Sequence, residues 1–242
     1  MGEAALVIGK EKKSTFMEKV MEILPEGGNL NLCLTCGACS SGCPASGIEN
    51  MDPRKFLRMA ALGIDEVAKS KWVWCCTLCR RCVYVCPMKI DIPALVHYAR
   101  QSWPREERPR GIRESCDLAL KTPGCSAMGA TSEDFRFVVE DVLAEVRETQ
   151  PRFKDMEAPI DKKGAEFFVN QNSREPVTEP DEMVPLWKIL HIVGADWTYG
   201  SVGWGAENYC MFLADDEAWE EIVRRKAKAV EDLGCKVWLN TE

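Results

Sequence analysis

Two short runs of cysteine constrain this chain more than any other feature of its sequence. The runs are Cys33, Cys36, Cys39, Cys43 with Pro44, and Cys76, Cys79, Cys82, Cys86 with Pro87. Both follow the pattern C-x2-C-x2-C-x3-C-P, which is the spacing that binds 4Fe–4S clusters where a protein holds two of them. Because the pattern occurs twice, the sequence predicts two cubane clusters.

The spacing also predicts how the cysteines are shared between the clusters. Three cysteines of a tight loop can reach three corners of one cube, whereas the fourth points away and binds the other cluster. Each proline that follows ends the loop without offering a backbone donor. The expected ligands are Cys33, Cys36, Cys39 and Cys86 for cluster one, and Cys76, Cys79, Cys82 and Cys43 for cluster two.

Two other uses of cysteine fit these runs less well. Disulfides need an oxidising compartment, and neighbours three apart in a turn rarely have the geometry to pair. A zinc site usually has two C-x2-C pairs set apart in the sequence rather than three cysteines in one loop. Nine of the 13 cysteines lie within residues 33–86, which indicates a reducing compartment in which they bind metal.

Charge and hydropathy limit the classes of partner that this protein is expected to bind. The net charge is −7, so neither nucleic acid nor anionic lipid is an expected partner. Residues 4–8 are the only apolar run near the N-terminus, which is not the pattern of a signal peptide. No stretch approaches about 18 apolar residues, so no direct membrane span is expected and any membrane link goes through a partner.

The first half of the chain has the pattern of helices. Helices are expected over 15–24, from Pro53 to Gly63, over 64–71, 94–102, 112–121 and 132–148. Asp52 before Pro53 is a typical start of a helix. The cysteine runs are thus joined by helix, which points to the helical variant of the ferredoxin fold. The polar, proline-containing stretch 149–163 is expected to be a linker.

After this stretch the pattern changes to an alternation of strands and helices. Strands are expected over 166–169, 196–199 and 235–239, helices over 182–193 and 215–233, and a glycine-rich turn over 200–205. This is the pattern of an α/β unit. The sequence stops straight after a strand, where a compact domain would continue with a return helix, so we expect this domain to be incomplete.

The predicted fold class is therefore mainly α, with a helical ferredoxin domain for two 4Fe–4S clusters followed by an incomplete α/β domain. The expected parts are an N-terminal extension and helix over 1–28, the ferredoxin domain over 29–105, a helical connector and linker over 106–163, and the α/β domain over 164–242.

Five cysteines lie outside the predicted ligand set. Cys75 is expected to be a buried thiol near cluster two, Cys116 and Cys125 isolated core thiols, and Cys235 part of the core. Cys210 follows the glycine-rich turn at the expected mouth of the α/β unit. No flavin, nicotinamide or heme motif is present, so electrons are expected to enter and leave through partners or a further cluster.

The paired motifs, the helical spacer with Asp52-Pro53-Arg54 and the α/β unit together resemble heterodisulfide-reductase-like iron–sulfur proteins. The sequence is most similar to the K subunit (DsrK) of the membrane complex associated with dissimilatory sulfite reductase, through segments 194–200, 203–210 and 233–238. The resemblance implies that the α/β domain is of the cysteine-rich CCG type. It also implies that the complete repeat, with a third, non-cubane 4Fe–4S catalytic cluster, lies downstream.

Two positions depart from the CCG repeat of this family. Asn170-Gln171-Asn172 stands where the repeat has its first cysteine, and Tyr209-Cys210-Met211 stands at the Cys-Cys-Gly. The repeat in this chain therefore looks degenerate. By the resemblance, Cys210 is a candidate catalytic residue that supplies one cluster ligand or lines the active site.

The resemblance implies a subunit of a redox complex on the cytoplasmic, inner face of the cell membrane, attached through partner subunits. Electrons from a quinol-linked cytochrome b-type subunit would pass through two cubanes toward a disulfide or trisulfide on a small sulfur-carrier protein (DsrC-type) in dissimilatory sulfate or sulfur metabolism. One alternative is a non-catalytic electron-transfer subunit of an anaerobic glycerol-3-phosphate, lactate or succinate-type dehydrogenase. Another is the related subunit of a complex linked to a periplasmic cytochrome.

Overall fold

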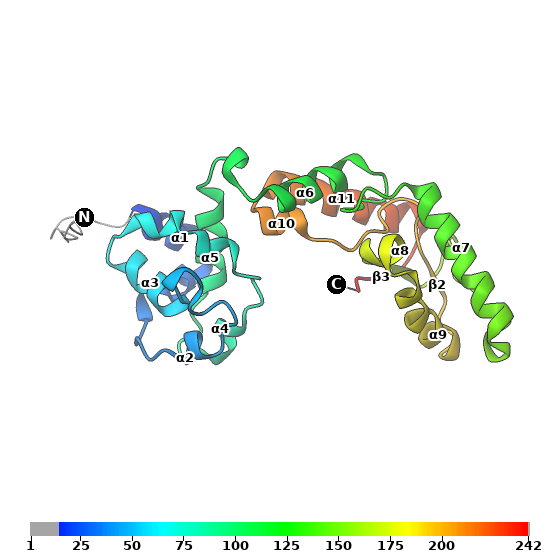
Figure 1. The fold of residues 1–242 in the computed structure, drawn as a ribbon, viewed down its shortest axis with the longest axis horizontal. Helices are drawn as coiled ribbons and strands as arrows, with labels where there is room; N and C mark the ends of the chain where they lie inside the picture. Colours follow the sequence, from blue (N-terminus) through cyan, green and yellow to red (C-terminus); the bar gives the residue numbers. More distant parts are fainter. Residues whose placement is uncertain (1–14, 242) are drawn as a thin grey trace. The chain divides into compact units, whose positions relative to one another are not determined.

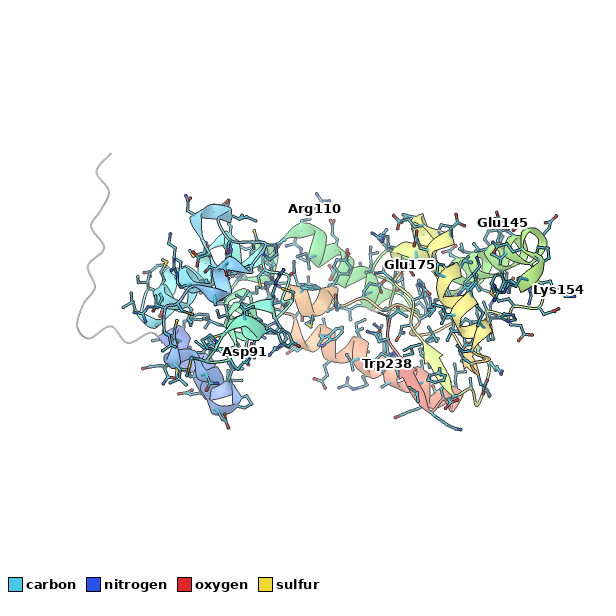
Figure 2. The ribbon with its side chains drawn as sticks, turned by 90° about the horizontal axis from the view of Figure 1, so that it is seen from below. Asp91, Arg110, Glu145, Lys154, Glu175 and Trp238 are labelled. Atoms are coloured by element: carbon cyan, nitrogen blue, oxygen red, sulfur yellow. A yellow bond between two sulfur atoms is a disulfide. The ribbon has the colours of Figure 1, made fainter. Side chains whose placement is uncertain are left out.

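The computed structural model describes residues 15–241, so the expectations for residues 1–14 and 242 lie outside the described residues. The chain divides into two compact units between Pro109 and Arg110, and Arg110 is labelled in Figure 2. We call them the first unit and the second unit. This single division falls within the stretch 106–163, which the sequence predicts as a connector.

The first unit is built from short helices. Its α-helices are α1 (Thr15–Ile23), α2 (Ala38–Ser41), α3 (Pro53–Ala61), α4 (Arg81–Val85) and α5 (Ile92–Gln101), and its 3-10 helices span Pro25–Leu32, Ile48–Asn50, Asp65–Lys69, Lys71–Trp74 and Arg105–Glu107. Helices α1, α3 and α5 pack against one another (Figure 1). Phe56, Trp72 and Leu95 are fully buried in the core that these helices enclose.

Side-chain caps start the two helices that carry most of this packing. The Asp52 carboxylate accepts a hydrogen bond from the Lys55 backbone N–H, and Pro53 follows the cap as the sequence predicts. The carboxylate of Asp91, which is labelled in Figure 2, accepts from the Ala94 N–H in the same way. Such caps satisfy backbone donors that a helix cannot pair by itself.

The second unit combines helices with a small parallel sheet. Its elements are α6 (Arg110–Lys121), α7 (Ser132–Thr149), β1 (Phe167–Val169), α8 (Arg174–Thr178), α9 (Val184–Ile192), β2 (Trp197–Thr198), α10 (Tyr209–Leu213), α11 (Asp216–Leu233) and β3 (Val237–Leu239), with 3-10 helices over Pro151–Phe153 and Pro180–Met183. The strand order is β2–β1–β3, and Phe167 is in register with both Trp197 and Val237. Parallel neighbours need crossover connections, which the helices between these strands provide.

Two apolar clusters form the core of the second unit. One surrounds Phe135, which stacks on Trp204 with ring centroids 4.1 Å apart. The other lies where α6, α10 and α11 pack side by side, and it includes Cys116 and Cys210 (Figure 1). Gly124 is required beside the first cluster, because a Cβ at this position would overlap the Trp204 indole.

The stretch 149–163 differs from the predicted linker because it packs into the second unit. Met156 is fully buried, and its carbonyl accepts a hydrogen bond of 2.7 Å from Arg147 Nε on α7. Ile160 pairs in parallel with Tyr199 next to β2. The stretch packs against α7 and β2 because apolar side chains among its charged residues are buried there. Within the described residues, no helix is both long and apolar enough to cross a membrane.

Candidate metal centre

The cysteines of the two runs line two cavities in the first unit. Each cavity has three cysteines from one run and the fourth cysteine of the other run. The Cys86 cavity is lined by Cys33, Cys36, Cys39 and Cys86, and the Cys43 cavity by Cys76, Cys79, Cys82 and Cys43. This grouping of side chains has the crossed pattern expected from the spacing, and the binding of iron by these residues stays a prediction.

The two cysteine loops share an unusual backbone conformation. Thr35 and Leu78, two residues after the first cysteine of each run, have φ of +59° and +55°. Gly37 and Arg80, directly after the second cysteine, have φ of +82° and +60°. A left-handed residue other than glycine costs free energy and persists where the surroundings require it, often at functional sites. In this conformation the Thr35 N–H donates to Cys33 Sγ at 3.4 Å.

Two short helices bring the runs together and account for the crossing. Cys39 lies on α2 and Cys82 on α4, and these helices pack against each other. Cys43 and Cys86 follow soon after the ends of these helices. Each fourth cysteine therefore leaves its own loop and faces the cavity of the other run.

A buried arginine holds the segment that leads into the second run. Arg100 on α5 is 1% exposed, and its guanidinium donates to the Val73 carbonyl at 2.9 Å and also to the Cys76 carbonyl. Burial lowers the pKa of Arg100 to about 10. Sequence reasoning missed this residue, although a basic residue on the otherwise apolar face of α5 was a signal that pointed to it.

Partial burial opposes ionisation of three of the thiols. It raises the pKa of Cys39 and Cys76, and raises that of Cys82 to about 12. The more exposed Cys79 has a lowered pKa, chiefly because the Arg81 backbone N–H donates to it. Metal ligands must be thiolates, so metal binding at these buried groups releases protons.

The donor set fits iron–sulfur clusters better than a single ion. In the part of the chain that the structure describes, no group of three or more His, Cys, Asp or Glu side chains can hold one metal ion together. Ligands of a cubane each bind a different iron, so they surround a cavity instead of meeting at one point. The four predicted ligands around each cavity have this arrangement, and the Cys43 cavity is lined by Cys75 as well.

The remaining cysteines differ in part from expectation. Cys75 is half-buried and lines the Cys43 cavity, beside its neighbour Cys76. The expectation that Cys116 is an isolated thiol is wrong, because Cys116 and Cys210 form a buried disulfide with Cα atoms 4.9 Å apart. Sequence reasoning could not find this pair, since 94 residues separate its members. Cys210 therefore lies in the core and not at an open mouth, and its catalytic role stays a prediction.

Comparisons with known proteins agree with the chemistry of the cavities. Residues 29–90 match the protein family described as the 4Fe-4S dicluster domain. The chain is 35% identical over 75 residues to the C2 subunit of the H(2)/formate:CoB-CoM heterodisulfide,ferredoxin reductase of Methanococcus maripaludis, which is 31% of this chain and 41% of that protein. It is 36% identical over 103 residues to a protein of Archaeoglobus profundus that is itself described as similar to the C subunit of heterodisulfide reductase, which is 40% of this chain and 54% of that protein.

A third relative shows the same extent of similarity. The iron-sulfur C subunit of the CoB--CoM heterodisulfide reductase of Methanopyrus kandleri is 35% identical over 91 residues, which is 37% of this chain and 47% of that protein. The chain thus spans about half or less of the length of the curated relatives it matches. The first unit contains a dicluster domain similar to those of heterodisulfide reductase C subunits, and the match supports two 4Fe–4S clusters.

Proposed function

We propose that this chain is an iron–sulfur subunit that passes electrons through two 4Fe–4S clusters held by its first unit. The grouping of eight cysteines, four at each of two cavities, carries the proposal. When bound, such clusters accept and donate one electron at a time. Cys33, Cys36, Cys39 and Cys86 would hold one cluster, and Cys76, Cys79, Cys82 and Cys43 the other.

The protein contributes buried apolar side chains to the lining of both cavities. Leu57 and Ile90 line the Cys86 cavity, Ala45 and Trp72 line the Cys43 cavity, and all four are buried. Ile92, which is 2% exposed, lines both cavities. Burial and hydrogen bonds to the sulfurs are the means by which a protein sets the potential of a cluster. Ile92 would then lie against both clusters when they are bound.

The finer proposal concerns the reaction that these electrons serve. Cleavage of a disulfide consumes two electrons and two protons and gives two thiols, so one-electron carriers must deliver twice. The relatives carry heterodisulfide reductase names, and the second unit combines helices with a small parallel sheet, as the α/β domain implied by the resemblance would. Electrons from a membrane cytochrome b-type subunit would reach a disulfide or trisulfide on a small sulfur-carrier protein (DsrC-type). The resemblance to DsrK supports this version, including a third cluster and attachment to the inner face of the membrane through partners.

A non-catalytic relay beside a separate flavoprotein is the second candidate, because the family match covers the cluster domain at residues 29–90. Iron quantitation and EPR on the anaerobically purified full-length protein test both. About eight irons per chain and signals of two reduced cubanes are expected. An added high-potential signal that responds to a thiol substrate would favour the reductase, and two cubane signals alone would favour the relay. Iron content below that of two clusters would contradict the proposal.

A further inference from the structure

The cysteine loops differ in charge from the rest of the chain. Segments 33–48 and 75–90 contain no Asp or Glu, whereas the chain as a whole has a net charge of −7. The basic residues in these segments are Arg80, Arg81 and Lys89. The side chains of these loops are therefore more basic than acidic on an acidic protein; Asp91 directly follows the second segment and pairs with Arg80 at 3.1 Å, and the thiolates around each loaded cluster would add negative charge of their own.

The structure places these charges at the cavities. Arg54 from α3 lines the Cys86 cavity, and Arg80 and Arg81 line the Cys43 cavity; all three residues are exposed. Arg54 Nη1 would lie 3.4 Å from a Cβ atom added to Gly37. Arg81 Nε would lie 3.6 Å from a Cβ atom added to Gly42. The guanidinium groups therefore lie against the cysteine loops themselves.

Exposed apolar side chains accompany the arginines. Leu34, between the first two cysteines of its run, is 66% exposed, and Tyr84, between the last two cysteines of the other run, is 76% exposed. Lys89 Nζ donates to the Tyr84 carbonyl at 2.8 Å, which holds the Lys89 charge beside the backbone of Tyr84. We call Leu34, Arg54, Arg80, Arg81, Tyr84 and Lys89 the cluster-loop face. Apolar contacts beside charge are the composition of a transient protein interface.

We propose that the cluster-loop face is the docking site of a small acidic electron-carrier protein. The inference rests on the proposed electron relay and names a partner for it. An acidic carrier fits because opposite charges steer encounter, and because this face brings the carrier nearest to the cysteines. With the clusters bound, the carrier would lose one electron and a cluster in the first unit would gain it; no proton would move and no bond would break.

The wild-type protein gives the first test. The cluster-loaded full chain is mixed anaerobically in a stopped-flow instrument with reduced flavodoxin, a small acidic flavoprotein. In parallel it is mixed with the methyl viologen radical cation. The rate constant with flavodoxin is expected to fall steeply as salt is added, because salt screens attraction between surface charges. The rate constant with the cationic viologen should not fall.

Charge reversal gives the second test. The double variant Arg54→Glu/Arg81→Glu should lower the rate constant with flavodoxin by about tenfold and flatten its salt dependence. The matched control Lys19→Glu reverses an exposed charge on α1 that lines neither cavity, and should change the rate less than twofold. If the charge-reversed variant loses its clusters, Arg54→Gln/Arg81→Gln replaces it. This variant should also lower the rate constant with flavodoxin, by a smaller factor.

The outcomes separate this inference from the proposed function. Failure of the wild-type protein to take electrons from either donor would overturn both. Electron uptake from flavodoxin without salt dependence, or an equal loss of rate with flavodoxin and viologen in the double variant, would overturn only the docking site. The second pattern would mean that the arginines act on the potential of the centres and not on encounter.

Discussion

Single residues outside the cysteine set shape the metal centre. The left-handed conformations at Thr35 and Leu78 recur at equivalent positions although the side chains differ. The loop geometry therefore follows from what the loop must surround and not from a glycine at that position. Arg100 contributes through the backbone, because its guanidinium donates hydrogen bonds to the carbonyls of Val73 and Cys76. The cysteine spacing predicts the ligands but not these supports.

Substitution of Cys79 tests the ligand assignment. Cys79→Ser is expected to remove cluster two and about half of the iron, while cluster one remains detectable by EPR, because a cubane without one thiolate is poorly held. Cys75→Ser is the matched control, since Cys75 lines the same cavity but lies outside the predicted ligand set. Unchanged iron in Cys79→Ser, or equal loss in Cys75→Ser, would contradict the assignment.

Glu207 predicts a pH dependence within the second unit. It is 4% exposed, its Oε2 has no hydrogen-bond partner, and burial raises its pKa. Lys226 and Cys125 are its charged or titratable neighbours. A raised carboxyl pKa means that the folded state favours the protonated form, so this stabilisation is present at low pH and is lost as pH rises through the folded pKa.

The measurement is the free energy of unfolding of the wild type and of Glu207→Gln from pH 5 to pH 8. The stability of the wild type relative to Glu207→Gln should decrease as pH rises. Glu221→Gln is the control: Arg225 lowers the pKa of this carboxylate, so its contribution is fully present above the unfolded pKa and the difference from the wild type should stay constant over this range. A constant difference between wild type and Glu207→Gln over this range would show that Glu207 does not titrate on unfolding.

At the scale of elements, the disulfide joins α6 to α10, two helices that are far apart in the sequence. Their packing was not predicted, because α6 was expected to belong to a connector. A cross-link that closes a loop of this length restricts the unfolded chain strongly. The stability of the second unit should therefore depend on whether Cys116 and Cys210 are oxidised to the disulfide.

This dependence has a direct test. In oxidised protein, Cys116→Ala should lower the stability of the second unit by about 2–4 kcal/mol, and should leave iron content unchanged. A reducing agent should lower the stability of the wild type and have little effect on the variant. Cys235→Ala, which removes a free thiol of the same unit, should respond to the reductant as the wild type does. Equal stability of wild type and Cys116→Ala when oxidised would exclude the cross-link.

At the scale of the whole molecule, the division between Pro109 and Arg110 separates the metal centre from the α/β elements. All eight predicted ligands lie in the first unit, and the disulfide lies in the second. Metal and disulfide would thus stabilise different parts of the chain. A protein of this kind is not expected to unfold in one two-state transition.

Removal of iron tests this separation. Anaerobic chelation should raise hydrogen exchange in peptides from residues 33–86, because a metal bound only by the folded state stabilises that state. Peptides from residues 110–241 should keep their protection. Reconstitution with iron and sulfide is the control and should restore protection in the first unit. Equal loss in both units would contradict their independence.

The sequence by itself determined the features that depend on local order along the chain. The cysteine spacing predicted the cluster type, with which the family match agrees. Asp52-Pro53 predicted the start of α3, because a cap acts within four residues. Strand and helix alternation predicted a small sheet, and its three strands are parallel. These signals come from residues that are near one another along the chain, so they can be read without knowing the distant contacts.

Apart from the crossed cysteine runs, only the tertiary structure decided which distant residues meet. It paired Cys116 with Cys210, buried Met156 within the expected linker, and placed Arg100 under the second cysteine run. It also gathered basic residues from α3 and α4 at the two cavities. Such contacts depend on how whole helices pack, and packing is a sum of many weak terms that no single segment encodes.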